Sequence, residues 1–301
     1  MSIVVNPPSL RIRQLECELI LQSGQFNQGG NVKIVNSNLI TSGVSTINAT
    51  VHTSLSSNFT NSADIIIYGM NESDIAALST LGYAALKYEL NGLNLYANYS
   101  DQQKSLCFSG YIVRAWCDFS DPSRPMHFEC QTTYQDALGD VTPTSVKGSV
   151  GVVDLFSKFA SSLGYSLQNN GVSGLLNNPI FTGSPIDQLK KLSKQTSTTC
   201  VADKGILKIA PFRFSLSNLE LSINSESGLL SYPTIDAWGV KLKIRYDPTL
   251  QIGQYIRLET IVPVPKATGR WYVYDMQSTL SNLHEPWYTE LKCSYDNVNF
   301  G

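Results

Sequence analysis

Residues 240–246, Val-Lys-Leu-Lys-Ile-Arg-Tyr, alternate strictly between apolar and cationic side chains. This is the cleanest period-two pattern in the chain. Because successive side chains of a β-strand point to opposite faces of its sheet, the spacing predicts a strand with one buried face and one wet face. A β-sheet that is solvated on one side is therefore the first expectation for this protein.

The composition favours strands in the rest of the chain as well. Charged residues make up only 15% of the 301 residues, so small polar side chains carry much of the surface. Such side chains compete with a helical backbone for hydrogen bonds, whereas the 15 Tyr and 11 Phe pack well on pleated sheets. Apolar residues reach 42%, which is enough for buried cores, and the length predicts two or three packed units.

Residues 1–134 are expected to form a first unit of short strands separated by turns. One short helix is predicted at residues 71–81, where a buried apolar run ends at Gly69 and acidic residues occupy the first turn. The spacing of the strands favours a β-barrel. The strands are expected within residues 10–21, 32–35, 44–51, 63–68, 93–96, 106–116 and 126–134.

Residues 135–211 predict a small α/β unit of two helices and a hairpin. Ser184 and Pro185 are a typical N-cap and first residue of a helix. Residues 198–210 predict a tight hairpin with Gly205 in its turn. An earlier helix is expected to end at Gly164, because six apolar residues fall on one helical face: Val152, Leu155, Phe156, Phe159, Ala160 and Leu163.

Residues 212–301 return to strands, and the order of their signals resembles that of the first unit. The repeat is either a coincidence of composition or a sign of two similar barrels in one chain. In the second case, three chains would close a ring of six barrels. The correspondences are Gly92 with Gly253, Gly110 with Gly269, and Cys130 with Cys293.

The sequence shows no recognisable catalytic or metal-binding motif. The candidates are three histidines and two acidic pairs: His52, His127, His284, Glu16/Glu18 and Asp118/Asp121. The histidines show no zinc spacing, and His127 alternates with apolar neighbours as a strand residue does. Glu16 and Glu18 share one strand face, which suits a wet face better than an acid–base pair. With no phosphate loop or nucleophile elbow, we predict no enzyme activity, catalytic residue, cofactor or metal.

The net charge of −2 argues against a protein that binds nucleic acid by neutralising phosphates. Basic residues are nevertheless concentrated in the second half of the chain, which carries 14 of the 22. They either line a channel through which DNA passes or cover a solvated strand face, and the second reading is favoured. The residues concerned are Lys241, Lys243, Arg245, Arg257, Lys266 and Arg270.

The six cysteines and the opening residues both indicate a chain that starts in a cytoplasm. Cys17, Cys107, Cys117, Cys130, Cys200 and Cys293 show no metal-type spacing, so we expect reduced thiols buried as small hydrophobic groups. The N-terminus lacks the charged region of a secretory signal. No stretch reaches the length needed to cross a membrane.

From residue 149 onward the order of motifs resembles the hub and late control D-like proteins of contractile phage tails. A helix that ends in Gly (residues 151–167) is followed by a helix and hairpin (184–211). Residues 227–259 then join a Gly-Leu-x-x-x-Pro entry, a strand and an Asp-Pro turn. Residues 269–295 place an aromatic strand before a loop that contains His284. The ordered set carries the resemblance, rather than any single motif.

This resemblance implies a mainly β fold with a small α/β insert. Two tail-tube-like β-barrel domains, residues 1–134 and 212–301, would flank a two-helix plus hairpin unit at residues 135–211. Three chains would form a pseudo-sixfold ring that joins the hexameric tail tube to the central spike. The expected partners are the tube protein, the spike and other baseplate proteins, and DNA would pass through the lumen without specific binding.

The same resemblance places the protein in the tail baseplate of a virion, after assembly in the cytoplasm of a bacterial host. Two other readings stay open from the sequence. A surface rich in Asn, Ser, Thr and Tyr suits a receptor-binding or adhesive β-protein of the virion. A cell-wall hydrolase is the third, and it predicts a cleft with two convergent carboxylates.

Overall fold

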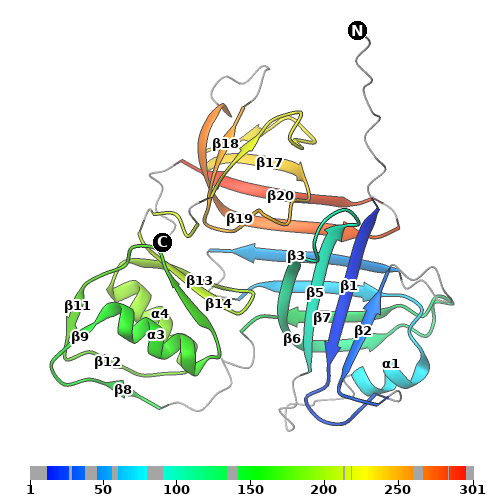
Figure 1. Ribbon diagram of the computed structural model, residues 1–301, viewed down its shortest axis with the longest axis horizontal. Helices are drawn as coiled ribbons and strands as arrows, with labels where there is room; N and C mark the ends of the chain where they lie inside the picture. Colours follow the sequence, from blue (N-terminus) through cyan, green and yellow to red (C-terminus); the bar gives the residue numbers. More distant parts are fainter. Residues whose placement is uncertain are drawn as a thin grey trace.

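A computed structural model describes most of the chain. The described residues are 12–26, 29–37, 46–55, 60–79, 91–133, 142–212, 214–217, 219–259, 267–283 and 285–295. The fold is mainly β, and Figure 1 shows a large sheet with a small α/β unit beside it. No helix among the described residues is long and apolar enough to span a membrane.

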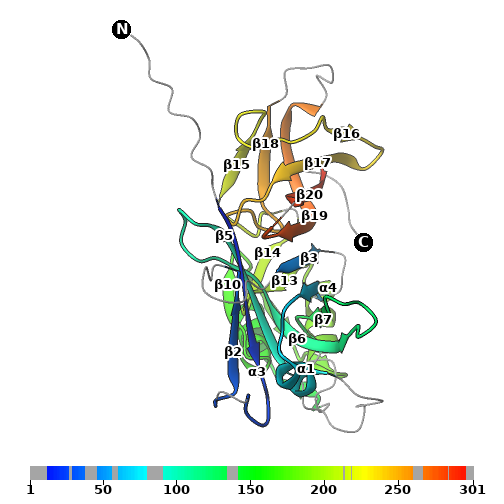
Figure 2. The same ribbon diagram turned by 90° about the vertical axis from the view of Figure 1, so that its right-hand side faces the viewer.

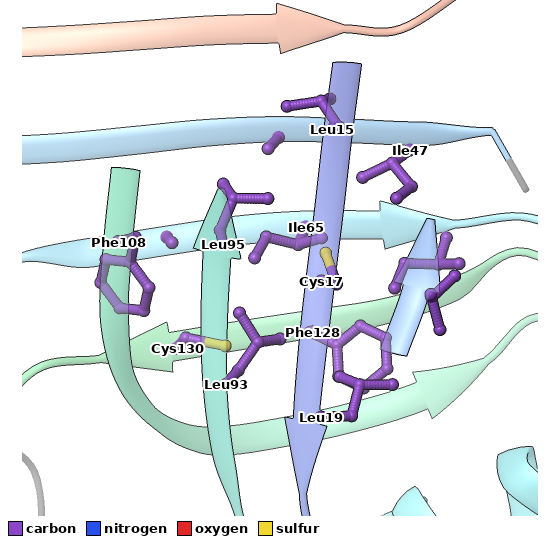
Figure 3. Close-up of a cluster of buried hydrophobic side chains, with 14 of the residues drawn as sticks. Leu15, Cys17, Leu19, Ile47, Ile65, Leu93, Leu95, Phe108, Phe128 and Cys130 are labelled. Atoms are coloured by element: carbon purple, nitrogen blue, oxygen red, sulfur yellow. The ribbon is translucent and has the colours of Figure 1, made fainter. Parts of the chain in front are cut away.

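The first part of the chain supplies β1 (Arg13–Ile20), β2 (Val32–Asn36), β3 (Ile47–Ser54), β4 (Ser62–Ile67), α1 (Glu72–Leu78), β5 (Gly92–Tyr99), β6 (Leu106–Cys117) and β7 (Met126–Gln131). We call this set the first β unit. Its strands form two crossed layers, with β1, β2 and β5 over β3, β4 and β7 (Figures 1 and 3). The long strand β6 belongs to both layers, because its first half pairs with β5 and its second half with β7. The strand bends at a bulge between Ile112 and Arg114.

The core of the first β unit lies between these layers. Leu15 and Leu95 from one layer face Ile65 and Phe128 from the other, and all four side chains are buried (Figure 3). The predicted short helix is confirmed as α1. Asn71 caps it, because the Asn71 side chain accepts a hydrogen bond from the backbone N–H of Asp74 at 2.9 Å.

The small α/β unit contains β8 (Thr144–Ser145), β9 (Ser149–Gly151), α3 (Val152–Ser162), β10 (Ser166–Asn169), β11 (Leu175–Asn177), β12 (Ile180–Phe181), α4 (Pro185–Gln195), β13 (Thr198–Asp203) and β14 (Ile206–Pro211). Both predicted helices are confirmed, and Ser184 and Asp187 form a reciprocal capping box at the start of α4. The predicted hairpin is β13–β14. Its turn residues Lys204 and Gly205 both have positive φ, as a type I′ turn requires. The sequence did not indicate β10, which adds a third, parallel strand beside β14.

The second β unit, as we name it, consists of β15 (Glu220–Ile223), β16 (Thr234–Ile235), β17 (Gly239–Arg245), β18 (Tyr255–Leu258), β19 (Gly269–Ser281) and β20 (Trp287–Ser294). The predicted alternation of buried and exposed side chains in residues 240–246 is confirmed in β17. Val240, Leu242 and Ile244 are buried in the core of this unit, whereas Lys241 and Arg245 are exposed.

The two β units share one sheet. Strand β19 of the second unit pairs antiparallel with β3 of the first, from Asp275 opposite Ser54 to Ser281 opposite Asn48. Within the described residues, thirteen strands thus form a single sheet with the order β16-β17-β20-β19-β3-β4-β7-β6-β5-β1-β2, from which β18 and β15 branch at β19. The described pairings close no barrel, because the order has free ends at β16 and β2.

The small α/β unit is fixed to this sheet by buried polar contacts. The Asn61 side chain, next to β4, donates to the carbonyl oxygen of Ala202 at 3.0 Å. The buried Lys208 ammonium donates to the Gln251 side chain at 2.9 Å, and Tyr165 donates to the carbonyl oxygen of Thr132 at 3.3 Å. Because these contacts reach both β units, the α/β unit holds them together from one side.

Replacing Gly239 with alanine is expected to lower the free energy of unfolding by about 2–4 kcal/mol. Gly239 has a φ of 154°, and a Cβ there would collide with the backbone of Cys293 on β20. Urea denaturation measures the loss. Gly69 is the matched control, because its φ is also positive, at 79°, but its Cβ would meet open space. Gly69→Ala should cost about 1 kcal/mol, and equal losses in the two variants would refute the steric argument.

Candidate assembly interface

A broad layer of eight strands, β16-β17-β20-β19-β3-β4-β7-β6, crosses both β units. Its outer face, away from the two cores, can be followed through the strand register. One row of paired neighbours runs Arg245, Tyr288, Thr279, Thr50, Asp64, Glu129 and Arg114 across seven strands. None of these seven side chains is fully buried, so the layer presents one continuous polar surface.

The charges on this outer face largely compensate one another. Arg114 pairs with Glu129 at 2.5 Å, and Lys292 pairs with Asp275 at 3.2 Å. His52 lies 3.0 Å from the same Asp275 carboxylate. Burial and the nearby Glu129 carboxylate raise the pKa of Asp64. A surface of mixed sign creates no strong field of one sign, and tight binding to phosphates requires such a field.

The basic residues singled out in the sequence are separated by the fold. On β17, Lys241 pairs with Asp236 at 3.0 Å, and Lys243 lies 3.8 Å from Glu290. Arg257 and Arg270, on β18 and β19, share the carboxylate of Glu220 at 3.4 and 3.0 Å. Arg245 is exposed at the end of β17, and Lys266 lies outside the described residues. Four of the six cations therefore have a carboxylate partner.

The histidines and acidic pairs do not converge on a cleft within the described residues. His127 stacks on Trp116 with ring centroids 5.0 Å apart, and His284 lies outside those residues. Glu16 and Glu18 accept hydrogen bonds from Asn36 and Asn94, at 3.1 and 2.8 Å. Both carboxylates thus belong to a polar network on the outer face of β1.

Asp118 and Asp121 close their own turns, by accepting hydrogen bonds from Ser120 and Ser123. These bonds hold the pKa of each carboxyl group below its usual value. The described part of the chain holds no cluster of three or more His, Cys, Asp or Glu side chains suited to a metal ion. The cysteines are unpaired thiols, and all except Cys117 are buried.

Both ends of the eight-strand layer carry exposed apolar side chains. Among the described strands, β16 pairs with β17, and the second half of β6 pairs with β7. The side chains concerned, with their exposed fractions, are Tyr232 (75%), Ile235 (40%) and Trp238 (61%) at the β16 end, and Trp116 (36%) and Phe119 (66%) at the β6 end. Exposed aromatic residues are a feature of assembly surfaces.

Sequence reasoning missed these edges. It interpreted Trp116 and its neighbours as ordinary strand residues, and only the order of strands in the sheet shows which of them lies at an edge. The local signal that could have found the β16 end is the short hairpin at residues 234–241. Its tip carries a tryptophan, although hairpin tips are usually polar.

Solved structures with a similar fold include two tail proteins and a component of the type VI secretion system. The tail protein from Neisseria meningitidis MC58 is 10% identical over 93% of this chain and 96% of that chain, with a TM-score of 0.61. The 43 kDa tail protein of prophage MuSo2 from Shewanella oneidensis is 8% identical over 94% and 98%, with a TM-score of 0.57. The E. coli c3393 protein, a component of the type VI secretion system, is 8% identical over 83% and 73%, with a TM-score of 0.52.

A search of curated protein sequences gives no significant match. The family model described as baseplate hub gp41 matches residues 44–293. This range includes β3, the whole α/β unit and nearly all of the second β unit, and therefore most of the eight-strand layer. The chain belongs to the baseplate hub gp41 family.

Proposed function

We propose that three copies of this chain form a ring of six similar β units, which joins a hexameric tail tube to a central spike in the baseplate of a contractile tail. Each chain contributes two tube-like, barrel-like units, so a threefold ring gains an approximate sixfold symmetry. The observation that carries the proposal is the duplication of strand order between the first and second β units.

The duplication extends through six strands. In the first β unit the sheet order is β3-β4-β7-β6-β5-β1, and in the second it is β16-β17-β20-β19-β18-β15. The matched strands also follow one another in the same order along the chain. The units differ in that β1 pairs antiparallel with β5 whereas β15 pairs parallel with β18. Strand β2 and helix α1 have no counterpart among the described elements of the second unit.

The register matches the two units residue by residue near their last strands. Cys130 on β7 lies between Ile112 on β6 and Ala63 on β4. In the second unit, Cys293 on β20 lies between Val273 on β19 and Val240 on β17. The long strand is bulged directly after Ile112 and directly after Val273. The register therefore supports the predicted correspondence of the two cysteines.

The predicted correspondence of Gly110 with Gly269 is wrong. Once the cysteines are matched, Tyr111 corresponds to Tyr272, because these residues lie opposite Gln131 and Ser294. Gly110 then corresponds to Trp271 rather than to Gly269, two residues away. The glycines differ in their positions: Gly269 is the first residue of β19, whereas Gly110 lies inside β6.

This arrangement would let identical chains adapt one symmetry to another. Six similar β units offer six similar surfaces to a sixfold tube. The parts of the chain that are not duplicated, such as the α/β unit, occur three times and offer three equal surfaces to a spike. The buried anchors at such permanent interfaces are typically aromatic. The mixed-sign outer face suits a channel wall that DNA passes without binding, and the proposal assigns no catalytic residue, metal or cofactor to the ring.

The mass of the native assembly tests this function. We expect sedimentation or native mass spectrometry to give about three times the 33.1 kDa of one chain, either for the purified protein or after tube and spike proteins are added. A reaction that stays monomeric at every concentration, with both partners present, would overturn the proposal.

A further inference from the structure

Residues 142–212, which contain the α/β unit, differ in charge from the rest of the chain. They include seven lysines, three aspartates, and no arginine or glutamate, which gives a net charge of +4. The rest of the chain carries 15 of the 22 basic and 21 of the 24 acidic side chains, so its net charge is −6. Positive charge is therefore concentrated in the α/β unit, which occurs once per chain.

The lysines of the α/β unit have no carboxylate partner within the described residues. Among those residues, the ion pairs all join side chains of the two β units. The Lys191 ammonium donates instead to the carbonyl oxygen and the hydroxyl of Thr182. Asp187 lies one turn before Lys191, but its carboxylate is held by Ser184 in the capping box. The positive charge of this unit thus remains available to a partner.

Three of the lysines form a stripe on α4. Lys190 and Lys191 both lie one turn before Lys194, so the three side chains share one side of the helix. The opposite side, with Leu189 and Leu192, is buried in the core of the α/β unit. Like charges at this spacing repel one another and destabilise a helix slightly. The stability of the fold therefore gives no reason for the stripe.

Next to α4, a two-stranded ribbon exposes apolar side chains. Strand β9 pairs with β11 and β8 pairs with β12, and the two pairs follow one another along the ribbon. On its inner side, Leu176 and Phe181 belong to the core of the α/β unit. On its outer side, Leu175 and Ile180 are 71% and 69% exposed. We call this outer side, with Leu175 and Ile180, the ribbon face.

Lysines lie at both strands of the ribbon face. Thr182, two residues after Ile180, is exposed as well, and its hydroxyl accepts a hydrogen bond from the Lys191 ammonium at 3.2 Å. On the other strand, Ser145 lies opposite Ile180, and the exposed Lys147 follows two residues later. Apolar side chains with cations around them fit a protein surface on which carboxylates surround a few apolar groups.

The ribbon face lies on the side of the molecule where a threefold partner would meet the proposed ring. In Figure 1 strands β3, β19 and β20 run horizontally. The α/β unit lies beside their left-hand ends, with β8, β9, β11 and β12 on its border away from the large sheet. Figure 2 looks along those three strands and shows the second β unit above the first. A ring in which β units follow one another in that direction would carry three α/β units on one rim.

We propose that the ribbon face and the α4 lysines bind an acidic protein surface that shares the threefold symmetry of the ring, which in the proposed function is the surface of the spike. This contact rests on the proposed ring, and it adds the residues and the chemistry through which the spike is held. A nucleic acid fits less well, because a phosphate backbone has no apolar groups to cover Leu175 and Ile180. Arginine, which holds phosphate through two parallel hydrogen bonds, does not occur in residues 142–212.

Charge reversal on α4 tests this contact. In binding measurements between the trimer and the purified spike protein of the same tail, we expect Lys191→Glu/Lys194→Glu to weaken binding at least about 30-fold, because carboxylates would then face carboxylates. Ile180→Ser should weaken it about tenfold through lost apolar contact. Neither variant should change the mass of the trimer, its thermal unfolding or its binding to the tube protein.

Lys243→Glu/Arg245→Glu is the matched control. It makes the same change in net charge, but on β17 of the second β unit, away from the ribbon face. The control should bind the spike as tightly as the unmodified ring does. A loss as large as that of the α4 variant would mean that overall charge, rather than the α4 lysines, determines binding.

The other outcomes separate this contact from the proposed function. A trimer that binds the spike equally well with and without the α4 lysines contradicts the contact and leaves the ring in place. A folded α4 variant that instead loses trimer formation, tube binding or binding to a short duplex DNA also contradicts it, because the surface would then have another occupant. A chain that forms no trimer, even with tube and spike proteins present, or a trimer that does not bind the spike, contradicts the proposed function and the contact together.

Discussion

Replacing Trp287 with alanine is expected to lower the free energy of unfolding by about 3–5 kcal/mol. Trp287 lies on β20 of the second β unit and is only 2% exposed, yet its side chain belongs to the core of the first β unit. Its ring packs against Tyr99 of β5, at a centroid distance of 5.7 Å, and against Tyr246, at 5.5 Å. The indole thus holds the two units together from the inside, and its removal leaves a large cavity at their boundary.

Urea denaturation of the isolated chain measures this loss. Trp238→Ala is the matched control, because Trp238 is also a tryptophan of the second β unit but is 61% exposed at the tip of the β16–β17 hairpin. It should change the free energy of unfolding by less than about 0.5 kcal/mol. Similar losses in the two variants would mean that the shared core does not join the units as described.

Replacing Ile235 with lysine is expected to weaken assembly about 100-fold or more and to leave the fold intact. Ile235 lies on the open edge of β16, so in a single chain the new ammonium group can extend into water. If the proposed ring covers this end of the layer, the ammonium group would instead be enclosed without a carboxylate partner at each contact between copies. An unpaired buried charge costs about 3–5 kcal/mol, which corresponds to a factor of about 100 or more in affinity.

Light scattering as a function of concentration gives the affinity, and thermal unfolding shows that the variant is folded. Ile34→Lys is a suitable control, because Ile34 is another exposed apolar residue on an edge strand, at 57% exposure on β2, and lies at the opposite end of the strand order from β16. It should assemble like the unmodified protein. If Ile235→Lys remains a trimer at the same concentrations, β16 does not form the contact.

Much of the local structure could be predicted because it depends on neighbours in sequence. The alternation of residues 240–246 gave β17, the Ser184–Pro185 pair gave the start of α4, and Gly205 gave the hairpin turn. In each case a few adjacent residues determine the backbone through burial, capping or a positive φ.

The junction of β3 with β19 could not be predicted in the same way. It pairs residues more than 220 positions apart, such as Ser54 with Asp275. The residues of neither strand indicate which strand it pairs with. The repeat was visible in Cys130 and Cys293, but Gly110 and Gly269 lie two positions apart once the cysteines are matched. The candidate interface depends on which strands lie at the ends of the eight-strand layer, which is a property of the whole sheet rather than of any segment.

Electron cryo-microscopy of the intact tail tests the central claim most directly. We predict three copies of this chain between the tube and the spike, arranged as a ring of six similar β units. Six copies in this ring, or density for the chain only at the periphery of the baseplate, would contradict it.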